Sequence, residues 1–196
     1  MSETPAATGA AFHELLAVTR EMNGESWLAS LSPKVQAAFG AAPDATFPDE
    51  MFCEALHVAD DTLAGGDGSL ARRLGRTRAD ASVGPMAASL GHDSFRFLKE
   101  GASLFYEGRA TYGATSVEIV PKRAILRMVV PEHFARRVGD SPNRGPMLAS
   151  AFLERGIELV CGTPQVPRYN GHAPRIDARF DRPMVNLLFE FDLEEG

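Results

Sequence analysis

The chain has 196 residues, of which 44% are hydrophobic and 23% are charged, values typical of a folded globular protein. Twenty-six acidic against 20 basic side chains give a net charge of −6, which argues against binding to nucleic acid or an anionic membrane. Two cysteines are too few for a disulfide framework or a four-thiolate zinc site. No apolar run approaches the roughly 18 residues of a membrane span, and residues 1–5 lack the features of a secretory signal. We therefore expect a cytoplasmic protein.

The first half of the chain has the spacing of amphipathic helices. Residues 1–9 are small and polar and are predicted to form a disordered tail, which leaves residues 10–196 as a single globular domain. Apolar residues recur at helical spacing from Phe12, and Ser32 followed by Pro33 is typical of a helix start.

The clearest helix of this half runs from Met51 to Leu63. It follows residues 46–49, whose spacing predicts a capping box. Further helical stretches are expected from Leu70, and over residues 94–107. Residues 10–108 are thus predicted to form a mainly helical layer.

After Gly113 the spacing changes from helical to alternating. A hairpin is predicted over residues 116–130, with its second strand in a central position. A helix ending at Gly162 and a proline-containing loop follow, and then a second hairpin with strands at residues 175–181 and 184–192. The predicted fold class is α/β (α+β). A helical N-terminal half packs on a four-stranded antiparallel sheet, and residues 113–192 have the order β-β-α-β-β.

The chain resembles a known family in three stretches and their order: SLSPKVQAAFGAAPDATFPDEMFCEALHVADDTL, GRTRADASVGP, and SFRFLKEGASLFYEGRATYGATSVEIVPKRAILRMVVP, before a helix ending GIELVCG and two strands. This order is similar to a family of uncharacterised paralogous proteins abundant in myxobacteria. It is more distantly similar to the fold of 4-vinyl reductase-like sensor domains, TRAPP subunits and haem NO-binding domains. The resemblance covers residues 30–192. It implies an often dimeric α/β domain with a hydrophobic interior pocket and no established enzymatic activity.

The chain departs from the cofactor-binding members of that fold group. The Tyr-x-Ser-x-Arg signature of the haem-binding domains is not matched around Tyr106 or Tyr112. The sensor domains carry cysteines around the last hairpin, whereas Cys161 precedes it. No cofactor and no metal are therefore predicted.

Other chemical motifs are incomplete. Cys53 and His57 are four residues apart on a predicted helix, but two ligands are fewer than a metal site gathers, and a partly buried cysteine beside a histidine is the simpler interpretation. Cys161 at a helix C-terminus is not activated, and there is no Gly-x-Ser-x-Gly motif. The sequence thus predicts no catalytic residues.

A second partial motif lies in the basic helix. Arg72 and Arg76 fit the first part of the cyclic-dinucleotide loop of PilZ domains, with Asp80 and Ser82 beyond them. Pro85 stands where the second part needs glycine, so a solvated basic helix face is the simpler interpretation.

Aromatic side chains on more than one face of the helix over residues 94–107 favour deep burial, a pocket or an interface. The predicted ligand-binding residues are Phe95, Phe97, Phe105, Tyr106, Arg109 and Arg127. We expect a non-enzymatic regulatory, sensor or scaffolding domain, a homodimer, that binds a small apolar ligand or a protein partner between helix and sheet. The alternatives are a haem- or metal-dependent sensor and an enzyme of unrecognised type.

Overall fold

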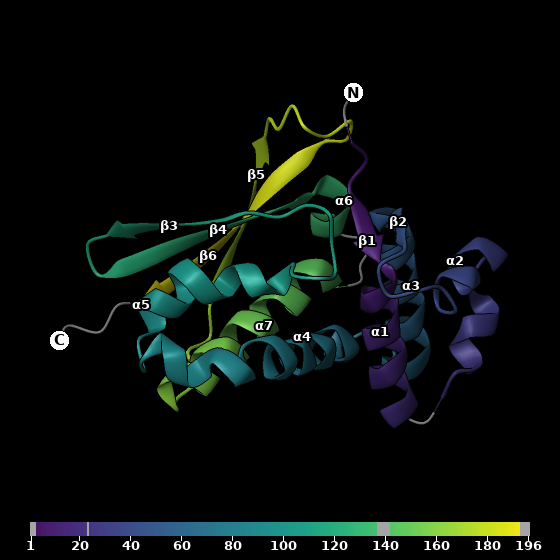
Figure 1. Ribbon diagram of the computed structural model, residues 1–196, viewed down its shortest axis with the longest axis horizontal. Coiled ribbons are helices and arrows are strands. Elements are labelled where there is room, and N and C mark those ends of the chain that lie inside the picture. The colour runs from purple at the N-terminus through teal and green to yellow at the C-terminus, as the bar shows by residue number, and fades with distance from the viewer. Residues whose placement is uncertain (1–2, 23, 137–141, 193–196) are drawn as a thin grey trace.

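Four antiparallel strands form the main sheet of the computed structural model, which describes residues 3–22, 24–136 and 142–192. The strands are β3 (Thr115–Val120), β4 (Arg123–Pro131), β5 (Arg168–Arg175) and β6 (Met184–Asp192), in the spatial order β3-β4-β6-β5. The predicted four-stranded antiparallel sheet is thereby confirmed. β4 takes the central position that its apolar run predicts (Figure 1).

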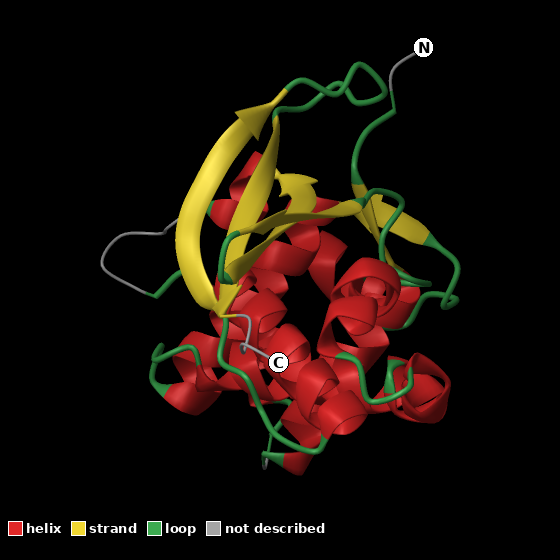
Figure 2. Cartoon of the chain, turned by 90° about the vertical axis from the view of Figure 1, so that its left-hand side faces the viewer, coloured by secondary structure: helices red, strands yellow, loops and turns green. Residues whose placement is uncertain are grey.

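Helices supply the second layer. They are α1 (Gly9–Glu21), α2 (Pro33–Ala38), α3 (Asp49–Ala64), α4 (Ser69–Ser82), α5 (Ser94–Arg96), α6 (Glu132–Ala135) and α7 (Arg144–Cys161). The long helices α4 and α7 lie side by side under one face of the sheet (Figures 1 and 2). The expected helical layer over a sheet is therefore present, with an additional short helix, α6, between the two hairpins. No helix among the described residues has the length and apolar character needed to cross a membrane.

The core lies between the sheet and these helices. Alternate residues of the central strands, such as Leu126 and Met128 of β4 and Leu187 and Phe189 of β6, are completely buried. Phe152 of α7 is also completely buried. The strand alternation places Arg127 on the opposite face of the sheet from Leu126 and Met128, where it forms an ion pair with Glu118.

The N-terminal segment differs from the expected disordered tail. Ala6–Thr8 form a strand, β1, that pairs with β2 (Thr46–Pro48), and Ala7 is buried. Glu3 exchanges backbone hydrogen bonds with Arg179 and Asp181 in the loop between β5 and β6. Composition alone favours disorder here, and backbone pairing with β2 is what makes the segment a strand.

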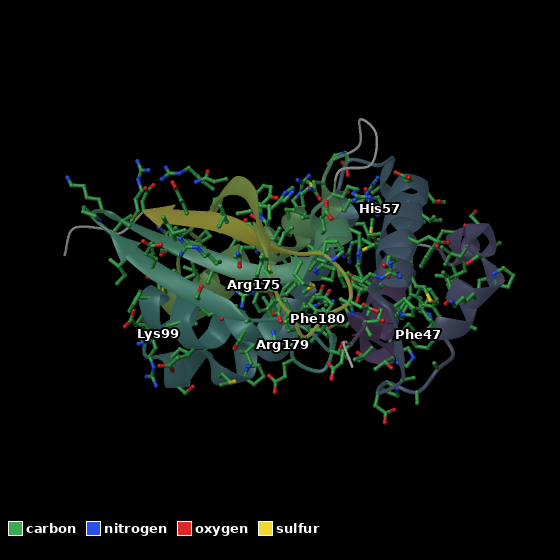
Figure 3. The ribbon with its side chains drawn as sticks, turned by 90° about the horizontal axis from the view of Figure 1, so that it is seen from above. Phe47, His57, Lys99, Arg175, Arg179 and Phe180 are labelled. Atoms are coloured by element: carbon green, nitrogen blue, oxygen red, sulfur yellow. The ribbon has the colours of Figure 1, made fainter. Side chains whose placement is uncertain are left out.

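The second hairpin begins earlier than the alternation of residues 175–181 predicts. Arg175 is the last residue of β5 and pairs with Met184, the first residue of β6, so residues 176–183 form the connecting loop. Ile176 is 99% exposed. Arg179 binds Asp177 inside this loop. Figure 3 labels Arg179 and Phe180 of the loop, and Arg175 at the end of β5. The predicted strand at 175–181 is therefore wrong. The true strand contains Pro174, which an edge strand tolerates.

Two predicted helix features also differ. The capping box at residues 46–49 is absent because Thr46 belongs to β2, and α3 starts directly after Pro48 with no side-chain cap. The helix predicted over residues 94–107 is irregular: after the three residues of α5 come a π-helical turn, Phe97–Gly101, and a 3-10 turn, Ala102–Phe105.

Candidate metal centre

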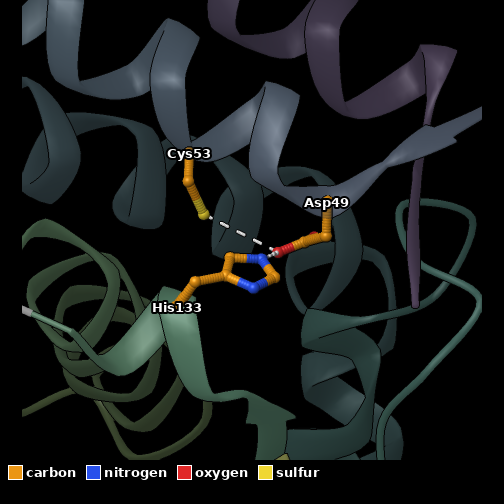
Figure 4. A group of neighbouring side chains, drawn as sticks. All are labelled: Asp49, Cys53 and His133. Atoms are coloured by element: carbon orange, nitrogen blue, oxygen red, sulfur yellow. Dashed lines mark hydrogen bonds and ion pairs between the residues drawn. The ribbon is translucent and has the colours of Figure 1, made fainter. Parts of the chain in front are cut away.

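Asp49 is the centre of a cluster of polar side chains at the N-terminus of α3. Its Oδ2 lies 2.8 Å from Nε2 of His133 and accepts a hydrogen bond of 3.6 Å from the Cys53 thiol. Its Oδ1 accepts a 2.6 Å hydrogen bond from the hydroxyl of Tyr112. Figure 4 shows Asp49 and Cys53 on one helix, with His133 approaching from a second element.

The local structure explains why these side chains meet. Cys53 follows Asp49 by four residues, so both lie on one face of α3. Pro131 ends the central strand β4, and α6 begins at the next residue, which carries His133 toward α3. The cluster therefore joins the helical half of the chain to one end of the sheet.

The cluster is buried on the Asp49 side and partly open on the histidine side. The Asp49 side chain is 1% exposed and the His133 side chain 21% exposed. A pocket of about 300 Å³ adjoins the cluster and is lined by Glu50, Cys53, Glu54, His57, Val58, His133 and Arg136. An ion or small solute can reach His133 and Cys53 through this pocket.

The arrangement is not that of a cysteine nucleophile with its base. In such a triad the histidine lies between the cysteine and the carboxylate, whereas here the Asp49 carboxylate binds both of the other groups. Burial, together with the neighbouring Asp49 and Glu50 carboxylates, raises the pKa of the Cys53 thiol well above its usual range. Cys53 is therefore a poor nucleophile at neutral pH.

The donor set does suit a transition metal. One oxygen, one sulfur and one nitrogen atom, from Asp49, Cys53 and His133, all lie within 4.8 Å of one another. Tetrahedral zinc bound by such ligands has ligand–ligand distances of about 3.3–3.6 Å. The oxygen–sulfur distance of 3.6 Å fits this range, whereas the oxygen–nitrogen distance of 2.8 Å is that of a hydrogen bond, which an ion bound to both atoms would lengthen. Sulfur and imidazole ligands favour zinc-like ions over magnesium or calcium.

One of the candidate ligands is held by a further hydrogen bond. The Tyr112 hydroxyl fixes the oxygen of Asp49 that does not face Cys53 and His133. The Glu50 carboxylate lies 3.8 Å from Nδ1 of His133, the ring nitrogen that faces away from Asp49, which is beyond hydrogen-bond distance.

The predicted ligand-binding residues are distributed over several places. Phe105, Tyr106 and Arg109 come together around a cavity of about 10 Å³, which is room for about one water molecule. Phe97 is completely buried against Phe152, and a Cβ on Gly156 would lie 2.2 Å from its ring, so Phe97 packs in the core.

The two remaining predicted residues lie apart from this cavity. Phe95 is half-buried on the short helix α5. Arg127 does not reach the space between helices and sheet, because it lies on the other sheet face, paired with Glu118.

Sequence reasoning found Cys53 but not its partners. Asp49 has the position of a capping residue in the sequence, and His133 lies 80 residues beyond Cys53 in an unremarkable segment. The sequence feature that could have indicated this site is the i, i+4 spacing of Asp49 and Cys53. Two ligands alone do not predict a metal site, because a third must come from elsewhere in the fold.

Comparisons with family models, with curated proteins and with solved structures give no match to this chain. The resemblance to the myxobacterial family and to the sensor folds therefore stays a prediction.

Proposed function

We propose that this chain is a non-enzymatic regulatory domain that binds one divalent transition metal ion, of the zinc class, through Asp49, Cys53 and His133. The observation that carries the proposal is the convergence of three different ligand types from two elements within 4.8 Å. The hydrogen bond from Tyr112 adds to it, because it occupies Oδ1 of Asp49 and leaves Oδ2 on the side of Cys53 and His133.

A bound ion would supply a cross-link rather than a reaction. Asp49 and Cys53 belong to α3, and His133 follows β4, so the ion would tie the helical half to the end of a central strand. Loss of the ion would leave the same side chains joined only by hydrogen bonds. Metal occupancy would thereby change the stability of the contact between the two layers, which is the property of a metal-responsive regulatory domain.

The test is zinc binding by the full chain after treatment with a chelator. We expect one zinc ion per chain by isothermal titration calorimetry and by elemental analysis after dialysis. Cys53→Ser and His133→Asn each remove one ligand and are expected to lower the affinity at least a hundredfold. Cys161→Ser is the matched control, because Cys161 lies outside the candidate centre and its thiol donates to the backbone oxygen of His92. No binding by the wild type, or equal binding by Cys53→Ser, contradicts the proposal.

A second proposal concerns the small apolar ligand predicted from the sequence. Its support is a groove of about 310 Å³ between α7 and β5, lined by Arg72, Asn143, Pro146, Met147, Ser150, Ala151, Glu154 and Tyr169. The apolar side chains suit an alkyl chain, and the Arg72 guanidinium suits an acidic head group.

Titration with a medium-chain fatty acid tests this second proposal. Met147→Ser is expected to weaken binding at least fivefold, whereas Val166→Ser, at an exposed apolar side chain outside the groove, leaves it unchanged. Absence of binding by the wild type contradicts it. The predicted homodimer is measured on the same samples by sedimentation velocity.

A further inference from the structure

We propose that Asn170 is a site of spontaneous deamidation, and that its conversion to isoaspartate loosens the edge strand β5. The reactive pair is Asn170 and Gly171, which follow one another within this strand. The inference goes beyond the proposed metal and fatty-acid sites and does not depend on either of them.

The reaction needs only these two residues and water. The backbone nitrogen of Gly171 attacks the side-chain amide carbon of Asn170, a carbon–nitrogen bond forms, and ammonia leaves with the proton of the attacking N–H. The product is a five-membered succinimide ring. Water then opens this ring at either carbonyl and gives aspartate or isoaspartate. Each conversion consumes one water molecule, releases one ammonia molecule and oxidises or reduces nothing.

The conformation of Gly171 is the first reason for this assignment. Its φ is +88°, a value that residues with a side chain rarely adopt, so the fold itself favours glycine at this position. A Cβ built on Gly171 would meet no other atom within 4 Å, which shows that the space around it is open. Because glycine has no Cβ, no side chain shields its nitrogen from the amide of Asn170.

The irregular pairing of β5 is the second reason. Among the strands of the described residues β5 lies at an edge of the sheet, where only β6 holds it (Figure 1). Regular pairing stops at Tyr169 and resumes at His172, so Asn170 and Gly171 together lie opposite one residue, Leu188. Two residues opposite one form a bulge and disrupt the ladder locally. The main chain is therefore freer to reach the ring-forming conformation here than in a regular strand.

The side chain of Asn170 is the third reason. It is exposed and makes no hydrogen bond to another described residue. Its amide group can therefore rotate toward the nitrogen of Gly171 without breaking a contact. Water also reaches this position, which the second step of the reaction requires.

The other asparagines of the described chain are poorer substrates. Asn143 precedes Arg144, and its side-chain nitrogen already donates to the backbone. Asn186 lies on β6, which is paired on both sides, and it precedes the completely buried Leu187. Asn23, which also precedes a glycine, lies outside the described residues.

Isoaspartate changes the strand itself. The main chain then passes through the former side-chain carbons, which adds one methylene group to the backbone of β5. Pairing with β6 cannot keep its register on both sides of the bulge after this insertion. The reaction also adds one negative charge to an already acidic chain. We therefore expect weaker pairing of β5 once Asn170 has been converted.

Peptide mass spectrometry of the full chain, aged at about pH 8 and then digested with trypsin, is the test. Cleavage after Arg168 and Arg175 releases a peptide with Asn170 as its single asparagine. We expect its mass to rise by about 1 Da at least ten times faster than that of the peptides with Asn143 and Asn186. Freshly prepared chain, digested in parallel, corrects for conversion during the digestion.

Variants at glycine test the role of the open backbone nitrogen. Gly171→Ala is expected to slow the conversion of Asn170 at least tenfold, because its methyl group shields the nitrogen. Gly162→Ala is the matched control and should leave the rate unchanged. Gly162 also has a positive φ, of +80°, and open space around it, but it does not follow an asparagine.

Hydrogen exchange on fresh and aged samples tests the structural effect. Aged wild-type chain should exchange faster in β5, whereas Asn170→Gln should not change with age, because glutamine forms the corresponding six-membered ring far more slowly. A wild type that stays unmodified, or equal rates at Asn170 and Asn186, overturns the site. Unchanged exchange in converted β5 overturns the loosening. Neither outcome bears on the metal or fatty-acid proposals, which are measured on freshly prepared chain.

Discussion

The hydroxyl groups of Tyr106 and Tyr112 have different surroundings, although the two rings are neighbours. The ring centroids are 6.0 Å apart in an edge-to-face arrangement, and both side chains are buried. The Tyr112 hydroxyl donates a 2.6 Å hydrogen bond to the Asp49 carboxylate, whereas the Tyr106 hydroxyl has no partner among the described residues. Burial and the Asp49 carboxylate raise the pKa of Tyr112 well above its usual range, so it stays a donor.

This contrast predicts that replacing each tyrosine by phenylalanine has a different effect on the free energy of unfolding. Tyr112→Phe removes a hydrogen bond to a buried carboxylate and is expected to lower the free energy of unfolding by about 1.5–3 kcal/mol. Tyr106→Phe removes a buried hydroxyl without a partner and should be neutral or stabilising. Urea unfolding of both variants measures the difference. Equal losses in the two would show that the Tyr112–Asp49 bond is not a net stabilising contact.

At the residue scale, the sequence predicts a candidate site only where the residues that form it are close together along the chain. The Cys53–His57 pair is visible because both residues lie on one helix, but only Cys53 belongs to the candidate metal centre. His133 reaches Asp49 only because β4 ends at Pro131 and α6 turns toward α3, which depends on the packing of the whole sheet. Spacing along the chain does not contain that information.

At the scale of elements, one acidic side chain joins three segments. Glu14 of α1 accepts hydrogen bonds from Arg78 of α4, at 3.0 Å, and from Arg109, at 2.6 Å. Its side chain is 19% exposed, and that of Arg78 is 4% exposed. Burial alone would raise the pKa of Glu14, but the charges and hydrogen bonds of Arg78 and Arg109 outweigh it and hold this pKa below its usual range.

The lowered pKa predicts an acid-dependent contribution to stability. The folded state binds the Glu14 proton more weakly than the unfolded state, so this stabilisation is fully present above the ordinary glutamate pKa of about 4.3 and is lost as the pH falls through the lower, folded-state value. Glu14→Gln should cost about 3 kcal/mol at pH 7, because it leaves the buried Arg78 without its carboxylate partner. The difference from wild type should shrink in urea unfolding as the pH falls below about 4.3. A difference that widens on acidification contradicts the assigned direction.

The close approach of α4 and α7 gives a second prediction at this scale. A Cβ on Gly75 would lie 2.2 Å from the carbonyl oxygen of Leu148, which is backbone and cannot move aside cheaply. Gly75→Ala should therefore lower the free energy of unfolding by about 1–3 kcal/mol despite the better helix propensity of alanine. Gly40→Ala is the control, because its Cβ would come no closer than 3.9 Å to another atom. Thermal unfolding distinguishes the two.

Element types were more predictable than element ends. The change from helical to alternating spacing near Gly113 correctly predicts the first hairpin and the helical half. The second hairpin is shifted because residues 175–181 alternate as well as a strand does, and register is decided by pairing with β6, where Arg175 lies opposite Met184. A short segment of small residues such as Ala6–Thr8 becomes a strand only when β2 is beside it.

At the scale of the whole molecule, the candidate centre lies where the helical half meets the sheet. Asp49 and Cys53 come from α3, and His133 comes from α6, directly after the central strand β4. Tyr112, which binds Asp49, lies in the segment that leads into β3. A ligand bound here is therefore linked to the stability of both layers and not only to that of one helix.

This position predicts that zinc stabilises the protein as one unit. An ion that binds only the folded state adds about 2.7 kcal/mol to the free energy of unfolding when its free concentration is a hundred times the dissociation constant. Urea unfolding with zinc and with excess chelator should show this difference in the wild type and lose it in Cys53→Ser. Hydrogen exchange should slow in α3 and also in β4 and α6, because the ion links them. Slower exchange confined to α3 would mean that the ion binds the helix without joining the layers, and the regulatory role would then lose its physical basis.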